Sequence, residues 1–166
     1  SGVAGSPFQI SQTTSTDQNP LAIGFDGTNY LAAWNWNIGP GTGVVSNWDV
    51  FGRVISASGS LTGNETGLVT DSGSQVMPAL AFDGVNYLLA WGDGSFNTTN
   101  STIRFRYFDT SASPVGSSFT VFSARGTNSP LFARNGLLFD GTRYVAAATL
   151  GLVQLDANGD VAGVPS

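Results

Sequence analysis

The stretch Phe25-Asp26-Gly27-Thr28-Asn29-Tyr30 occurs three times, in closely related form, in this chain of 166 residues. The other copies begin at Phe82 and Phe139, a spacing of 57 residues in each step (82 − 25 and 139 − 82). In each copy an Asp-Gly pair separates two apolar runs, and glycine there accepts the positive φ of a hairpin turn. A period of this size is typical of repeat proteins. The sequence therefore predicts an all-β chain with one sheet per repeat.

Each repeat is expected to hold four short strands. The segment after the turn begins Tyr30-Leu31-Ala32, so apolar residues point to both faces, and such strands are covered on both sides. The strands are expected, in order, at 21–25, 30–34, 50–55 and 68–70; at 79–82, 87–91, 103–108 and 119–122; and at 136–139, 144–148 and 152–155.

No fourth strand is expected at the end of the third repeat. The amino-terminal run Val3-Ala4-Gly5 matches Val161-Ala162-Gly163, and Phe8-Gln9-Ile10 continues like Phe119-Thr120-Val121. Residues 7–10 are therefore expected to supply the outer strand of the last sheet, which would protect an open edge. The expected organisation is one domain, 1–166, with repeats at about 11–70, 71–122 and 123–166.

The string Phe-Asp-Gly-x-Asn-Tyr-Leu-x-x-Trp is followed by Asp49-Val50-Phe51-Gly52-Arg53-Val54. It resembles the tandem repeats of secreted bacterial β-propeller proteins over nearly the whole chain. The third copy departs from it, with Arg143 in place of Asn and Ala148 in place of Trp. The resemblance implies propeller blades of four strands and an extracellular or cell-surface location. It implies no reaction.

Three repeats are fewer than the four to eight blades of most propellers. Two chains could close a six-bladed ring, which would resemble bacterial lectins in which short chains pool their blades. Alternatively, the chain could belong to a longer array, or three sheets could close as a β-prism. The spaced Gln-Asp-Asn-Tyr motif of monocot mannose-binding prisms is absent. The homodimeric six-bladed ring is the expected form.

The charge and composition argue against several classes of partner. The chain has six Lys and Arg, eleven Asp and Glu, no His and no Cys, for a net charge of −5. Without a basic stripe, binding to nucleic acid or to an anionic membrane surface is not expected. No apolar run approaches the roughly 20 residues of a membrane-spanning helix. Without Cys or His, no cofactor, metal site or thiolate catalysis is expected.

The long loops, which connect the second and third strands of the first two repeats, carry the candidate binding residues. They hold Trp36, Trp48, Asp93 and Phe96 together with several Asn and Thr residues. An indole ring offers a flat apolar platform for a sugar, while amides and carboxylates accept its hydroxyl groups. Trp34 and Trp91 recur at equivalent positions, so these two are expected to pack between sheets.

The sequence favours a recognition module over an enzyme. Propeller glycosidases need paired carboxylates near the ring axis, whereas the repeated acids here stand in Asp-Gly turns and Glu65 is the only glutamate. The expected function is extracellular, non-enzymatic binding of a glycan or a surface protein through the Trp-bearing loops. The alternatives are a structural repeat segment of a larger surface protein and a propeller-type glycoside hydrolase.

Overall fold

The computed structural model describes residues 5–12, 18–38, 47–94, 102–123, 132–148, 151–156 and 158–163. This part of the chain forms strands joined by turns and contains no helix. None of the described segments could therefore cross a membrane as a helix. The strands are β1 (Gln18–Phe25), β2 (Asn29–Asn37), β3 (Trp48–Ser56), β4 (Leu61–Val69), β5 (Gln75–Phe82), β6 (Tyr87–Asp93), β7 (Thr102–Phe108), β8 (Pro114–Ser123), β9 (Phe132–Phe139), β10 (Tyr144–Ala148), β11 (Gly151–Leu155) and β12 (Val161–Gly163).

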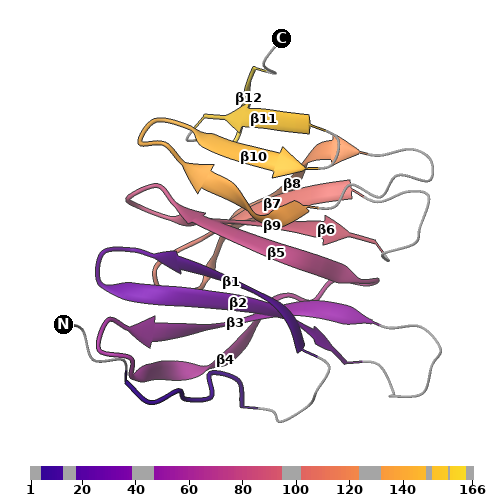
Figure 1. Ribbon diagram of the computed structural model, residues 1–166. Coiled ribbons are helices and arrows are strands. Elements are labelled where there is room, and N and C mark those ends of the chain that lie inside the picture. The colour runs from indigo at the N-terminus through magenta and orange to yellow at the C-terminus, as the bar shows by residue number, and fades with distance from the viewer. Residues whose placement is uncertain are drawn as a thin grey trace.

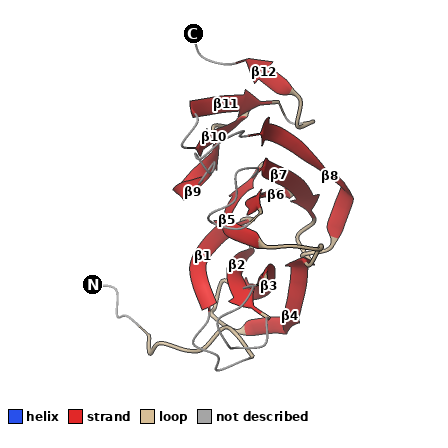
Figure 2. Cartoon of the chain, turned by 90° about the vertical axis from the view of Figure 1, so that its right-hand side faces the viewer, coloured by secondary structure: helices blue, strands red, loops and turns tan. Residues whose placement is uncertain are grey.

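These strands make three antiparallel sheets of four strands, each paired in chain order, so that each repeat folds as a meander. The sheets lie face to face in a stack, from the first at the bottom of Figure 1 to the third at the top. Their inner strands β1, β5 and β9 lie along one side of the stack, and the outer strands β4, β8 and β12 lie along the other (Figure 2). We call the face of a sheet toward the preceding sheet its front, and the opposite face its back.

The Asp-Gly turns have the geometry that the sequence predicts. Asp26 Oδ1 accepts hydrogen bonds from the backbone N–H groups of Thr28 and Asn29, at 2.7 and 2.6 Å. The corresponding carboxylates of Asp83 and Asp140 accept the same pair of bonds in their own turns. Positive φ values at the glycines that follow complete the turns,. The three aspartates are therefore turn residues.

Apolar side chains fill the two spaces between the sheets. Leu31 and Ala33 on the back of the first sheet pack against Tyr87, Leu89 and Trp91 on the front of the second. The second junction repeats this arrangement, with side chains from the back of the second sheet packed against the front of the third. Burial on both faces explains why the second strand of each repeat carries apolar side chains on both of its faces.

The outer strands differ from the prediction in two ways. The fourth strand of the third sheet is β12, so the sheet is formed without the amino-terminal residues. Residues 7–10, expected to close this sheet, lie on the first sheet instead: Ile10 packs on its front face, and Arg53 Nη1 donates to the Ile10 carbonyl at 3.1 Å. In addition, β4 begins at Leu61, well before the expected position 68.

Candidate functional site at the junction of the first two sheets

A break in β5 shapes the junction between the first and second sheets. Pro78 has no N–H for the ladder, and the pairing of β5 with β6 shifts between Val76 and Ala79. The buried Asn35 side chain satisfies the irregular backbone: its Nδ2 donates to the Gln75 carbonyl at 2.6 Å, and its Oδ1 accepts from the Met77 N–H at 2.7 Å. This contact fixes the start of β5 against β2.

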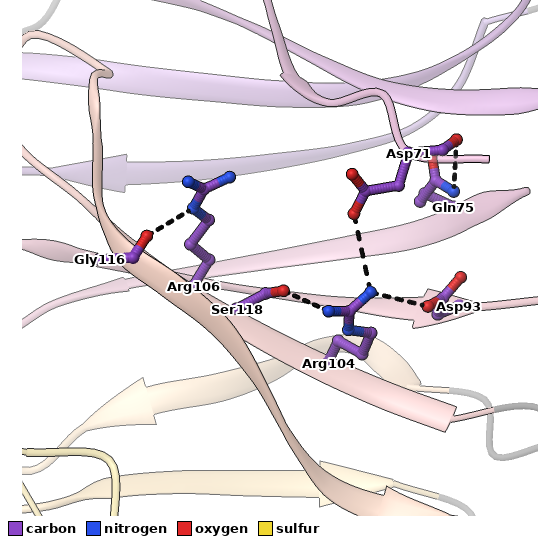
Figure 3. A network of polar contacts seen from close by, with 7 residues as sticks. All are labelled: Asp71, Gln75, Asp93, Arg104, Arg106, Gly116 and Ser118. Carbon is purple, nitrogen blue, oxygen red and sulfur yellow. Dashed lines mark hydrogen bonds and ion pairs between the residues drawn. The ribbon is translucent and has the colours of Figure 1, made fainter.

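Arg104 on β7 is the centre of a polar cluster beside this break (Figure 3). Its Nη1 lies 3.2 Å from Asp93 Oδ2 and 3.6 Å from Asp71 Oδ2, and its Nη2 donates to Ser118 Oγ. The guanidinium also stands 5.9 Å from the centre of the Trp91 ring, at cation–π distance,. Arg104 thus joins the connection after β4 to strands of the second sheet.

The cluster is open to solvent on one side. The side chain of Asp71 is 59% exposed, whereas those of Arg104 and Asp93 are about half as exposed. The three charges leave one net negative charge, and the free carboxylate oxygen positions can accept further hydrogen bonds. Arg104 is therefore held in place by protein groups while its partner Asp71 faces the solvent.

Asp49 is a buried carboxyl group on β3, on the face of the first sheet that also carries Trp36. It is almost fully buried, and its Oδ1 has no hydrogen-bond partner among the described residues. Burial raises the pKa of Asp49 above its ordinary value, and the negative charge of Asp71 raises it further,. Gln75 is fully buried as well, and its Oε1 likewise lacks a partner in the described part of the chain.

The structure brings two of the four predicted site residues to this junction. The Trp48 N–H is 3.4 Å from Ser74 Oγ, and the Ser74 carbonyl accepts from the Gly94 N–H, next to Asp93, at 2.8 Å. Trp48 itself is half-buried. Trp48 and Asp93 therefore both lie next to Ser74, at the edge of the junction where β3 begins and β6 ends.

The other two predicted residues are not part of this arrangement. Trp36 pairs with Asp49 across the two strands, and the next residue, Asn37, pairs with Trp48. Because successive side chains point to opposite faces, the indoles of Trp36 and Trp48 lie on opposite faces of the first sheet. Trp36 is half-buried and packs edge-on against Phe51, with ring centres 4.9 Å apart. Phe96 lies outside the described residues.

The two repeated tryptophans are both buried, but only Trp91 packs between two sheets as predicted. Trp34 and Trp91 are 4% and 0% exposed, and their Nε1 atoms have no hydrogen-bond partner in the described ranges. Trp91 faces the first sheet across the junction, whereas Trp34 lies on the front of the first sheet beside Ala32 and Ile55. Both side chains therefore stabilise the fold and are not available to a ligand.

The sequence prediction missed Arg104, Asp71 and the two buried polar residues. One signal was present: Arg104 stands where the first repeat has Phe51 and the third has Gly151, by the register of the strands. A charged residue that departs from its own repeat needs a local partner. Its acidic partners are Asp93, at the end of β6, and Asp71, in the connection between β4 and β5, and the spacing of the repeats did not single out either of them.

The cluster can donate and accept hydrogen bonds, which the binding of a polyol requires. In the described segments no three acidic side chains come together as metal ligands. Comparisons of the chain with protein-family models, with curated proteins and with solved structures found no match.

Proposed function

We propose that the chain is a propeller-type, extracellular recognition module that binds a glycan at the junction of its first two sheets. The observation that carries this proposal is Arg104, held between two carboxylates at a partly exposed position, with Trp48 at the same edge of the junction. Sugar hydroxyls pair well with carboxylates and guanidinium groups, while the indole packs on the apolar face of a pyranose ring.

Propeller geometry is favoured over a three-sheet prism by the face-to-face stack of meanders, with the inner strands on one side (Figure 2). The low content of charged residues, 10%, together with many Ser, Thr, Asn and Gly residues, favours an extracellular location. A structural segment of a larger surface protein is the main alternative. It accounts for the stack but not for an arginine cluster placed at the open end of a junction.

A non-enzymatic role agrees with the distribution of acids. Strands β1, β5 and β9, which would line the axis of a ring, carry no Asp or Glu. A glycoside hydrolase needs two carboxyl groups flanking the scissile bond, about 5–10 Å apart. A hydrolase would therefore have to use acids away from the axis, and the cluster around Arg104 has its carboxylates engaged by a cation.

The test is a glycan array followed by calorimetry on any sugar that binds. Trp48→Ala and Asp71→Asn should each lower the affinity at least tenfold, about 1.4 kcal/mol, with melting temperatures close to wild type. Trp36→Ala, on the opposite sheet face, and Asp160→Asn, an exposed acid in the third sheet, are the matched controls and should bind normally. Binding that survives both site variants would place the site elsewhere. A folded protein that binds a surface protein but no glycan would overturn the proposal.

A further inference from the structure

The contact between neighbouring sheets occurs twice with the same plan. Tyr87 Oη donates to the backbone carbonyl of Asn29 at 3.2 Å, and Tyr144 Oη donates to that of Asn86 at 3.5 Å. In both junctions the tyrosine begins the second strand of one sheet, and the acceptor is the residue before the equivalent tyrosine of the preceding sheet. The front of one sheet is therefore built to fit the back of another.

Both ends of the stack display faces that are covered inside it. Leu80 and Leu137 lie two residues before their Phe-Asp-Gly turns, face the front of their sheets, and are 8% and 5% exposed. The equivalent residue of the first sheet, Ile23, is 55% exposed. One residue before the turn, Ala81 is 7% exposed on the back of the second sheet, but Leu138 of the third sheet is 52% exposed. Along the inner strands β1 and β9, the first front and the third back are thus the uncovered halves of a junction, while Ala32 and Trp34 on β2 of the first front are buried.

The amino-terminal segment already occupies a position that belongs to such a junction. A β-carbon placed on Gly159 would meet the ring of Phe119, an outer-strand residue of the preceding sheet, at 2.7 Å. A β-carbon placed on Gly59, in the same turn of the first sheet, would meet the ring of Phe8 at 3.6 Å. Phe8 therefore lies on the first sheet much as β8 lies on the third.

The third sheet has room for such a segment at its outer edge. In the described residues β12 pairs with β11 only at Gln154 and Leu155. In the second sheet the outer strand continues further, where Phe119 pairs with Phe105. The residue equivalent to Phe105 is Leu152, which is exposed in the described part of the chain. A segment similar to the part of β8 around Phe119, placed at the equivalent position, would complete the outer strand of the third sheet.

We propose that two copies of the chain close a ring, in which the front of the first sheet binds the back of the partner's third sheet. In this contact the Tyr30 hydroxyl donates to the carbonyl of the partner's Arg143, as Tyr87 and Tyr144 do within the chain. Residues 8–10 continue the partner's outer strand, pairing Phe8 with the partner's Leu152. Known rings hold roughly four to eight sheets. Because each chain supplies three sheets, only a ring of six falls in this range, and two copies are enough to close it.

The closing contact differs from the internal ones at one position. A β-carbon on Gly24 would lie 2.9 Å from the Tyr87 ring, so the first junction has no room for a side chain there. The equivalent residue of the third sheet is Leu138. The Tyr30 ring must therefore sit further from the partner's third sheet, and the closing contact is expected to be weaker than the covalently linked internal ones.

Light scattering after gel filtration gives the first test, with the chain as it stands. Wild type should have twice the mass of one chain. Leu138→Asp and Ile23→Asp should each reduce it to a monomer with an unchanged circular dichroism spectrum, because both residues are exposed at the ends of the stack. Val85→Asp, in an exposed turn, is the control and should remain dimeric. A wild-type monomer, a larger assembly, or a dimer that persists in both end variants would overturn the proposal.

A disulfide gives a second test that does not depend on destabilising the contact. A β-carbon on Gly24 would lie 3.6 Å from Cβ of Leu80, within the distance that a disulfide spans,. The equivalent pair across the closing contact is Leu138 and Ile23. Because the chain has no cysteine, mixing Ile23→Cys with Leu138→Cys should give a covalent dimer on oxidation, whereas Ile23→Cys with Val85→Cys should not. Equal yields of covalent dimer from both mixtures would contradict the proposed contact between the first sheet and the partner's third sheet. Neither test depends on the glycan site, which lies within one copy.

Discussion

The hydroxyl group of Tyr87 donates a hydrogen bond to the backbone carbonyl of Asn29, 3.2 Å away, and so joins the second sheet to the first. Tyr144 joins the third sheet to the second in the same way, at 3.5 Å. The repeat thus specifies the inter-sheet contact as well as the fold of each sheet. Stability and binding should therefore respond to different residues of the same junction.

Removal of the Tyr87 hydroxyl tests this contact. Tyr87→Phe should lower the free energy of unfolding by about 1 kcal/mol, the usual net contribution of one hydrogen bond. Tyr144→Phe should cost less, because its hydrogen bond is longer. Urea unfolding followed by tryptophan fluorescence would measure both. A Tyr87→Phe variant as stable as wild type would show that the hydroxyl does not hold the sheets together.

The buried tyrosines should also limit stability in alkali. Burial raises the pKa of Tyr107 to about 12 and moves those of Tyr87 and Tyr144 upward as well, mainly through desolvation,. Since the native state retains protons that the unfolded chain loses, stability should be full below about pH 10 and decline as the pH rises to 12,. Phenolate absorbance should therefore increase together with unfolding. Ionisation of all four tyrosines in the folded protein would contradict the assignment.

Asp49 should destabilise the fold at neutral pH. Its folded-state pKa is raised, so the native state favours the protonated carboxyl and loses stability as the pH rises above the unfolded value of 3.8,. Asp49→Asn removes the charge while keeping the size of the side chain. The variant should melt at a higher temperature than wild type at pH 7, and this gain should disappear in acid. A lower melting temperature at pH 7 would mean that the Asp49 charge has a stabilising partner.

The two classes of tryptophan should separate stability from binding. Trp91→Ala removes a fully buried ring and should cost about 3–5 kcal/mol of unfolding free energy,. Trp48→Ala, at a half-buried position, should cost less than about 1 kcal/mol, as most changes near the surface do. Thermal and urea unfolding of the two variants would give the comparison. Similar large losses from both would place Trp48 in the core and weaken the case for a glycan platform.

The features repeated within each unit could be predicted from the sequence. Phe-Asp-Gly turns, two-sided apolar strands and buried Trp34 and Trp91 follow from local chemistry and from the period, and all are present. The early start of β4 was missed, because its Thr-Gly-Asn-Glu-Thr-Gly run has little strand propensity,. Pairing with β3 forms that strand. The prediction from the sequence match of residues 7–10 was wrong, because within one chain these residues form no strand and lie on the first sheet.

The candidate site could be predicted only in part, because it depends on contacts between repeats. The long loops indicated Trp48 and Asp93, which the structure brings close together. Alternation along β2 and β3 separates Trp36 from Trp48, a consequence of register that composition cannot show,. Arg104 on β7 meets Asp71 in the connection between β4 and β5, a contact that the strand pattern does not indicate. A site made at such a junction becomes visible once the stacking is known.

The most direct test of the recognition site is an NMR titration of the labelled protein with a glycan identified on the array. The four indole N–H resonances report on Trp34, Trp36, Trp48 and Trp91 separately, once assigned by substitution. The Trp48 resonance and the Arg104 side-chain signals should shift until the protein is saturated with the glycan, while those of the buried Trp34 and Trp91 stay in place. A shift confined to Trp36, or no shift at the first junction while the glycan binds, would contradict it.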